Sequence, residues 1–151
     1  MRCIGVLILL VSFEAAAQQL VNTDPIRLFL PGGQPVSFKT MGWHRLETNW
    51  LKICSDSSST IYAPFNVTIM DTFTVNEHLI LKLKVNGKNT VLIGGLQPGN
   101  WTKGSKVEKG SVLGTVKLFP GDRQFKLYCM VLQKKSPLPA AEALKFLEEL
   151  P

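Results

Sequence analysis

The segment Lys103–Val116 (KGSKVEKGSVLGTV) constrains the fold more than any other stretch of the chain. Two Lys-Gly pairs punctuate it, at Lys103-Gly104 and Lys109-Gly110, and Gly114 follows them. Glycine adopts a positive φ without steric cost, and short β-branched runs between glycines favour strands. The segment therefore predicts turn, short strand, turn and strand, as in a small all-β barrel or sandwich. It contains no histidine and no pair of carboxylates, so it indicates architecture rather than catalysis.

Residues 1–17 have the pattern of a secretory signal peptide. Arg2 supplies the charged start, Ile4–Phe13 is an apolar run, and Ala15–Ala17 gives small residues for cleavage. The apolar run is too short to cross a bilayer, which takes about 20 residues. No later stretch is long or apolar enough for a membrane span. We therefore expect a secreted, extracellular protein, with residues 18–151 forming one β domain.

The net charge of +6 favours anionic partners. In an extracellular setting these would be an anionic glycan or an acidic face of a protein receptor, whereas nucleic acid is not expected. Lys103, Lys106 and Lys109 lie three residues apart on the turn-rich segment and are the candidate binding residues. The alternative is that they are ordinary solvated turn residues.

Secretion also predicts covalent modifications. Cys3 leaves with the signal, so Cys54 and Cys129 remain, and in an oxidising compartment they would most economically form one disulfide. A reactive thiol or a metal ligand is the alternative, although no histidine–cysteine cluster accompanies either residue. Asn66 and Asn100 begin Asn-x-Thr sequons and are candidate glycosylation sites.

The remaining chain alternates strand patterns with turn signals. Leu79, Leu81, Leu83 and Val85 alternate with other residues as in a half-buried strand, and Asn86-Gly87 predicts a hairpin turn. Apolar residues at helical spacing predict a short helix near the C-terminus. The expected strands and helix are Ile26–Leu30, Trp50–Cys54, Thr60–Asp71, His78–Val85, Asn89–Ile93, Phe125–Leu132 and, as the helix, Pro139–Leu150.

Several motifs, in order, resemble those of the lysostaphin-type (LytM) zinc metallopeptidases, including their secreted vertebrate branch of the leukocyte cell-derived chemotaxin type. The resemblance covers about residues 47–146. It implies a mainly β fold, a small barrel-sandwich hybrid with a short C-terminal helix. The matching stretches are Tyr62–Phe65 for the family's "VYAP" strand, Asn86–Leu96 for "NG…TLYAHL", Lys103–Val116 for the glycine-spaced segment, Phe125–Val131 for "HLHFEV" and Ser136–Leu144 for the closing "DP…YL".

The zinc ligands that this resemblance implies are absent from the expected positions. The family's first His and its Asp fall on Glu47 and Leu51, with a register that could slip by one residue. The third ligand, the second His of the family's His-x-His pair, falls on Leu127. The first His of that pair and the "YAHL" histidine, which assist catalysis in the family, fall on Phe125 and Gly95. Leu51 and Leu127 cannot hold a metal, so we expect no zinc, no cofactor and no hydrolase activity. The apolar replacements would instead let the floor of the former cleft pack as core.

The histidines do not restore such a site at the sequence level. They are His44 and His78, and His78 begins a strand remote from the motif positions. A different two-histidine site would still need a third ligand and an oriented outer shell. The same counting makes the disulfide uncertain, because Cys54 and Cys129 would face opposite sides of their strands. An unpaired chain would then carry a free thiol or form a disulfide-linked dimer.

Three functions remain open from the sequence. The first is a secreted, non-catalytic binding protein on a degenerate peptidase scaffold, with a receptor or a glycan as partner. The second is a divergent zinc peptidase, and the third is a protein that binds peptidoglycan through an inactive cleft. The first is favoured because it accounts together for the signal, the charge and the lost ligands.

Overall fold

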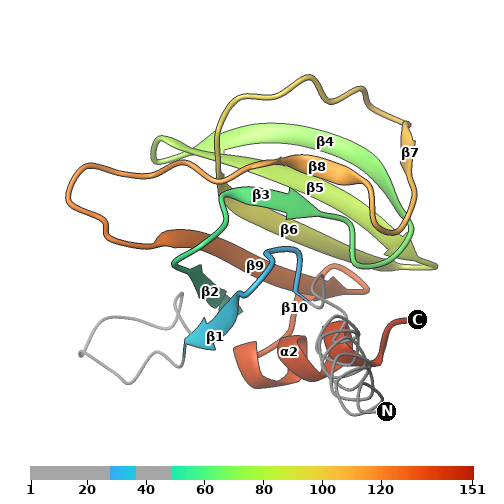
Figure 1. Ribbon diagram of the computed structural model, residues 1–151. Helices are drawn as coiled ribbons and strands as arrows, with labels where there is room; N and C mark the ends of the chain where they lie inside the picture. Colours follow the sequence, from blue (N-terminus) through green and yellow to red (C-terminus); the bar gives the residue numbers. More distant parts are fainter. Residues whose placement is uncertain (1–27, 37–48) are drawn as a thin grey trace, which may run out of the picture.

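The computed structural model describes residues 28–36 and 49–151. The expected signal peptide, residues 1–17, and the candidate ligand position Glu47 lie outside the described residues. The fold is mainly β with one short C-terminal helix, which confirms the predicted fold class (Figure 1). The elements are β1 (Gln34–Val36), β2 (Leu51–Ser55), β3 (Thr60–Tyr62), β4 (Val67–Val75), β5 (His78–Asn86), β6 (Asn89–Leu96), β7 (Lys106–Val107), β8 (Val112–Thr115), β9 (Phe125–Gln133), β10 (Ser136–Pro137) and α2 (Ala140–Glu149).

The strands form two antiparallel sheets. The large sheet has the order β1-β2-β9-β6-β5-β4-β7, with β10 paired to β9, and the small sheet consists of β3 and β8. In the described part of the chain, β1 and β7 are the two ends of this order, and no pairing closes it into a ring. The architecture is therefore an open sheet covered by a smaller one rather than a closed barrel.

The glycine-punctuated segment behaves as its sequence predicts. Gly104 and Gly110 adopt φ of 88° and 86°, and each precedes a short strand. Its two strands belong to different sheets, because β7 pairs with β4 and β8 pairs with β3. The segment therefore ties the small sheet to the edge of the large one. The predicted turn at Asn86-Gly87 is confirmed as well, since it joins β5 to β6 with Gly87 at φ 43°.

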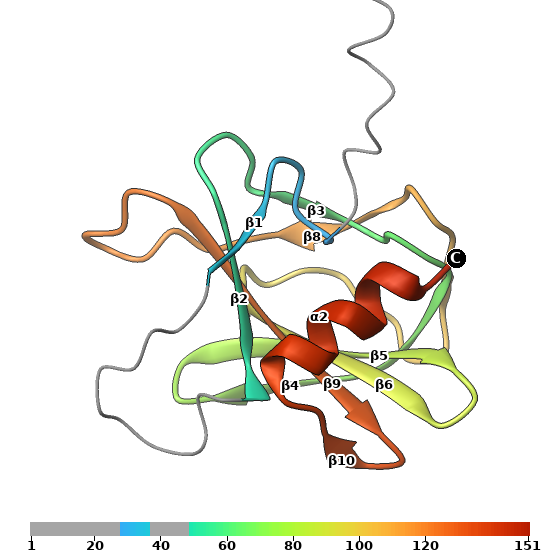
Figure 2. The same ribbon diagram turned by 90° about the horizontal axis from the view of Figure 1, so that it is seen from below.

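The core lies between the large sheet on one side and the small sheet with α2 on the other. Alternate residues of β5, β6 and β9 point into it, among them Leu83, Ile93 and Leu127, each 0% exposed. The helix adds Ala143 and Leu147, and it contacts β2 and β9, as the view from below shows (Figure 2). No helix of the described residues is both long and apolar enough to cross a membrane.

The first described residues correct one expectation. Leu28–Leu30 were expected to end a strand, but they form a turn in which Phe29 has φ 66°. The reason is burial: all three side chains are inside the core, and the ring of Phe29 meets that of Phe65 edge to face at 5.6 Å. A regular strand alternates its side chains between two faces and could not bury three in succession.

The Ser-rich turn after β2 is held by one buried hydroxyl. Ser55 is 2% exposed, and its Oγ donates to the carbonyl oxygen of Pro31 at 3.0 Å. The same oxygen accepts hydrogen bonds from the backbone N–H groups of Ser57 and Ser58, each at 3.3 Å. These three hydrogen bonds hold the turn that follows β2 against the Pro31 segment.

Candidate functional site

The pairing of β2 with β9 separates a core face from an open face. Leu51 lies opposite Cys129, and Lys52 lies opposite Tyr128. Leu51 and Cys129 are buried in the core cluster. Residues directly opposite each other share a face, so Lys52 and Tyr128 lie on the other side of the sheet.

This alternation places two of the candidate ligand positions on the core face. Leu51 and Leu127 are 5% and 0% exposed and point into the core, away from solvent. A hydrolytic metal site needs a position open to water, which the core face does not offer. The open-face residues are one position further along each strand, Lys52 on β2 and Tyr128 on β9. Leu51 and Leu127 are therefore part of the core, as expected if this part of the former cleft packs as core, and Lys52 and Tyr128 are the residues of these strands that face the open side.

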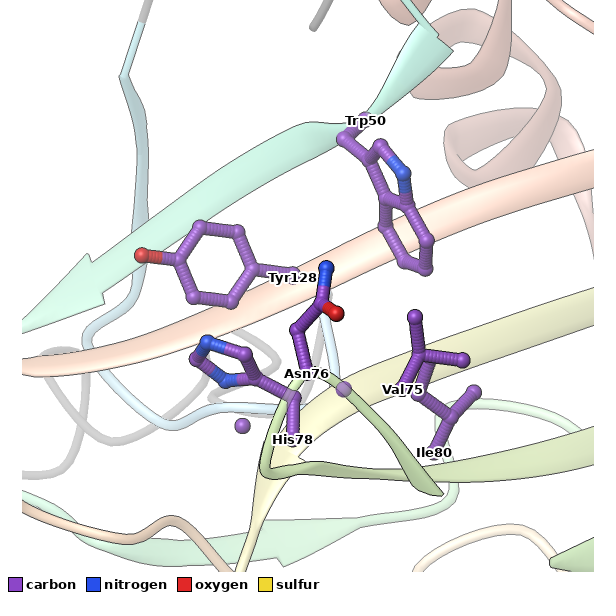
Figure 3. A pocket seen from close by; sticks show the side chains of 8 residues that line it. Trp50, Val75, Asn76, His78, Ile80 and Tyr128 are labelled. Carbon is purple, nitrogen blue, oxygen red and sulfur yellow. The ribbon is translucent and has the colours of Figure 1, made fainter. Parts of the chain in front are cut away.

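The open face carries a cavity of about 330 Å³, drawn in Figure 3. Trp50 stands on one side of it, opposite Val75 and Ile80, while the rings of His78 and Tyr128 lie together at the other end. The backbone of Gly94 and Gly95 completes the wall. The lining is mostly apolar and aromatic, with an imidazole, a phenol and a carboxamide from Asn76 as its polar side-chain groups, as expected of a ligand pocket.

His78 belongs to this site, contrary to the sequence-based expectation that it is remote. Its ring centroid lies 6.1 Å from that of Tyr128 and 5.0 Å from that of Phe119. The Nζ of Lys117 in turn lies 5.0 Å from the centre of the Phe119 ring. The strand order explains why the rings of His78 and Tyr128 lie close together. Only β6 lies between β5, which begins at His78, and β9, which contains Tyr128.

Electrostatics at this end of the cavity centre on a phenol and an ion pair. Burial raises the pKa of Tyr128 above its ordinary value of 10.0, although the neighbouring Lys126 charge acts in the opposite direction. Lys126 donates a hydrogen bond to the carboxylate of Asp122, and this bond raises the pKa of the lysine. Tyr128 is therefore a neutral donor at physiological pH, and Lys126 is a paired cation.

Gly95 has a backbone that excludes a side chain. Its φ is 86°, and a Cβ at this position would lie 2.8 Å from the carbonyl oxygen of Lys126. A left-handed φ disfavours every residue with a Cβ, and a contact under 3.0 Å with backbone cannot be relieved by a rotamer change. This is the position to which the resemblance assigns the family's "YAHL" histidine. The local conformation does not accommodate that residue.

The expected disulfide is absent from the structure, in which Cys54 and Cys129 are both buried free thiols. Cys129 is on the core face, whereas Cys54 lies opposite Lys126 on the other face. They are also offset by three positions along β2 and β9, about 10 Å at roughly 3.3 Å per residue. A disulfide requires Cα atoms roughly 4–7 Å apart, so this register does not allow the bond. Burial raises the pKa of Cys129 to about 12.

The candidate binding lysines lie away from the cavity. Lys103 and Lys109 lie in the turns that flank β7, Lys106 is in β7 itself, and all three are exposed. None of them lines the 330 Å³ cavity. They are neighbours in sequence of residues that line a second hollow of about 310 Å³, between β4 and the segment that leads into β7.

Both sequon asparagines are exposed near the same segment. The Oδ1 of Asn66 accepts a hydrogen bond from the backbone N–H of Lys109 at 2.8 Å. Asn100 lines the second hollow. Neither asparagine lines the cavity on the open face.

Comparison with known proteins places the fold. No family model matches the sequence, and no curated protein matches it significantly. Among solved structures, lysostaphin in solution is similar, with a TM-score of 0.55 and 13% identity over 76% of this chain. A zinc-containing peptidase from Vibrio cholerae aligns with a TM-score of 0.46 and 16% identity over 72% of this chain. The aligned regions cover 51% and 34% of those chains, so this chain corresponds to about half of the lysostaphin structure. The chain has a lysostaphin-like β fold.

Proposed function

We propose that this chain is a secreted, non-catalytic binding protein that uses a lysostaphin-like scaffold to hold an extracellular ligand at the open-face cavity. The observation that carries the proposal is the backbone of Gly95. A histidine cannot occupy this position while φ is 86° and the carbonyl oxygen of Lys126 lies 2.8 Å from the Cβ site. The peptidase site that the resemblance implies would be missing a residue that one substitution cannot restore.

The side chains around the cavity support the same proposal. On the open face, Lys52 lies opposite Tyr128, and neither residue is one of the Cys, His, Asp or Glu ligands that zinc sites use. Among the described residues, His78 supplies the only imidazole of the lining, and none of them contributes a carboxylate to the cavity. Within the described ranges, no three His, Cys, Asp or Glu residues lie together as a metal-holding group.

The cavity also indicates the kind of ligand. Trp50, Val75 and Ile80 present apolar surface, and a volume of about 330 Å³ is at the lower end of the ordinary range for ligand pockets. Such a cavity fits one or two apolar or aromatic side chains better than a sulfated sugar. We therefore favour a protein receptor that inserts a hydrophobic side chain, with the exposed lysines contributing long-range attraction.

Cell binding by matched variants tests this proposal. Fluorescently labelled protein is titrated onto intact cells, and the Trp50→Ala variant is compared with Val112→Ala. Val112 is 60% exposed on β8 and does not line the open-face cavity. Saturable binding that weakens at least tenfold in Trp50→Ala, persists in Val112→Ala and survives added heparin is the expected result.

Three outcomes would overturn the proposal. Equal binding by both variants would remove the cavity from recognition. Complete competition by heparin would favour an anionic glycan as the ligand. Retention on insoluble peptidoglycan, with chelator-sensitive release of fragments, would favour a divergent zinc peptidase.

A further inference from the structure

The outer edge of β4 changes character halfway along its length. At Val67 and Thr68 the strand is covered by β7, and Ile69 exchanges backbone hydrogen bonds with Gly104 and Ser105. No strand of the described residues pairs with the outer side of the remainder, Asp71–Val75. All five of these residues are exposed. We call this segment the β4 edge.

The hairpin turn fixes which backbone groups of the β4 edge point outward. Asn76 and Glu77 form a two-residue loop with φ of 47° and 66°, the conformation of a tight hairpin in which the flanking Val75 and His78 form a hydrogen-bonded pair. Hydrogen-bonded and non-hydrogen-bonded pairs then alternate along the ladder. The N–H and C=O groups of Thr72 and Thr74 consequently point away from β5. A hydrogen bond of Thr72 supports this assignment: its backbone N–H donates to the side-chain carboxylate of the preceding residue, Asp71, at 2.9 Å.

Two other edges of the sheet carry protection that the β4 edge lacks. β1 contains Pro35, and β7 is only two residues long and contains Lys106. Proline, lysine and shortness are the usual means of preventing strand addition. The β4 edge (DTFTV) has neither proline nor lysine, and its protection is confined to one end, where the charged Asp71 follows a register shift in the pairing with β5. It exposes Phe73 and Val75 by 38% and 46%, and both count among the exposed large hydrophobic residues of the described ranges.

The sequence of the β4 edge is symmetric about Phe73, with a threonine on each side. In an antiparallel pairing of two copies about a twofold axis at Phe73, the outward backbone groups of Thr72 meet those of Thr74 in the other copy. The two Phe73 residues then form a non-hydrogen-bonded pair, in which side chains approach most closely. Threonine–threonine and aromatic–aromatic pairs are both favourable across strands. This pairing requires the backbone N–H and C=O groups of Thr72 and Thr74 to point outward. That is the arrangement that follows from the Asn76-Glu77 turn.

We propose that two copies of this chain associate through their β4 edges, as antiparallel strands related by a twofold axis at Phe73. The interface is isologous, because the same segment serves both copies. Val75 both belongs to this edge and lines the open-face cavity, so each dimer would bring its two cavities close to the shared interface. The association is concentration-dependent, and the net charge of +6 on each copy opposes it at low ionic strength.

Site-directed crosslinking tests the register. In a non-hydrogen-bonded pair the Cα atoms are about 4.5 Å apart, which lies within the range that a disulfide can span. Phe73→Cys should therefore form a disulfide-linked dimer under mild oxidation, and raising the salt concentration should increase its yield. Val75→Cys is the matched control, because position 75 faces position 71 of the other copy and its own counterpart lies more than roughly 10 Å away. The native Cys54 and Cys129 are buried and should not contribute.

Sedimentation velocity of the protein without an added cysteine tests the association itself. The wild type should show a monomer–dimer equilibrium that shifts toward dimer with concentration and salt. Thr74→Pro should abolish the dimer while preserving the circular dichroism spectrum, since it removes an outward N–H that β5 does not use. Val112→Lys, a change at an exposed apolar residue of β8, should leave the equilibrium unchanged.

Two results would overturn the proposal. One is a wild type that remains monomeric up to millimolar concentration with no crosslinking of Phe73→Cys. The other is equal crosslinking of Phe73→Cys and Val75→Cys, because a specific twofold register cannot produce it.

Discussion

Replacing Gly95 by alanine should destabilise the fold through two separable effects. The left-handed backbone at φ 86° costs a residue with a Cβ roughly 1–2 kcal/mol. The added Cβ would also lie 2.8 Å from the carbonyl oxygen of Lys126, and overpacking of this kind costs about 1–3 kcal/mol. Gly95→Ala should therefore lower the free energy of unfolding by about 2–5 kcal/mol, measured by urea denaturation.

Two other glycines separate these effects. Gly110 has the same φ of 86° but no atom within 4 Å of its Cβ site, so Gly110→Ala should lose only about 1–2 kcal/mol. Gly94 has no positive φ, and its nearest contact is ordinary, 3.5 Å to Cγ1 of Ile80. Gly94→Ala should therefore change stability by less than about 1 kcal/mol. If Gly95→Ala behaved like Gly94→Ala, the argument that position 95 excludes a histidine would fail.

Three further predictions concern the core and the thiols. Gly114→Ala should destabilise by about 1–3 kcal/mol and alter indole fluorescence, because its Cβ would lie 2.9 Å from the ring of Trp101, which donates to Leu113. Intact mass after alkylation should show Cys54 and Cys129 unmodified in the native protein and both modified in urea; one intramolecular disulfide would contradict the register. Burial raises the pKa of Cys129 from 9.0 to about 12, so the folded state retains this proton while the unfolded state releases it. The free energy of unfolding should therefore fall as the pH rises from 9.0 to about 12. The Cys129 thiol accounts for a fall of up to about 1.4 kcal/mol per pH unit, so Cys129→Ala should make the pH dependence shallower.

Local signals in the sequence were sufficient for much of the fold. The Asn86-Gly87 turn and the two Lys-Gly turns specify backbone conformations that few other residues adopt, and the structure has turns at these places. The alternating pattern of β5 and the spacing in α2 also report directly which face is buried. These features depend on neighbouring residues only, so one sequence reveals them.

The candidate site was harder to predict because it depends on register. Strand side chains have a period of two, so an error of one residue exchanges the core face and the open face. Pairing with β9 decides that Leu51 faces the core and Lys52 the open side, and this pairing is not visible in the sequence of β2 alone. The hydrogen bonds of the buried Ser55 hydroxyl, which shape the turn after β2, are likewise not visible in the sequence.

The cavity itself could not be read from the sequence because its walls come from distant strands. Trp50, His78 and Tyr128 meet only because β6 and β9 bring β5 and β2 near each other in the sheet. Taken singly, each of these three residues looks like an ordinary aromatic residue within a strand or at the end of one. A prediction of strand order in addition to strand positions would have been needed.

The most direct test of the central claim is the zinc content of the purified protein. The protein is incubated with excess zinc, dialysed against metal-free buffer and analysed for zinc per chain by mass spectrometry. A peptidase site with three protein ligands would retain one zinc per chain. A non-catalytic scaffold, in which Leu51 and Leu127 pack in the core and Lys52 and Tyr128 lie on the open face, predicts far less than one bound zinc per chain. One tightly held zinc per chain, removed by chelator together with a peptide-cleaving activity, would contradict the account.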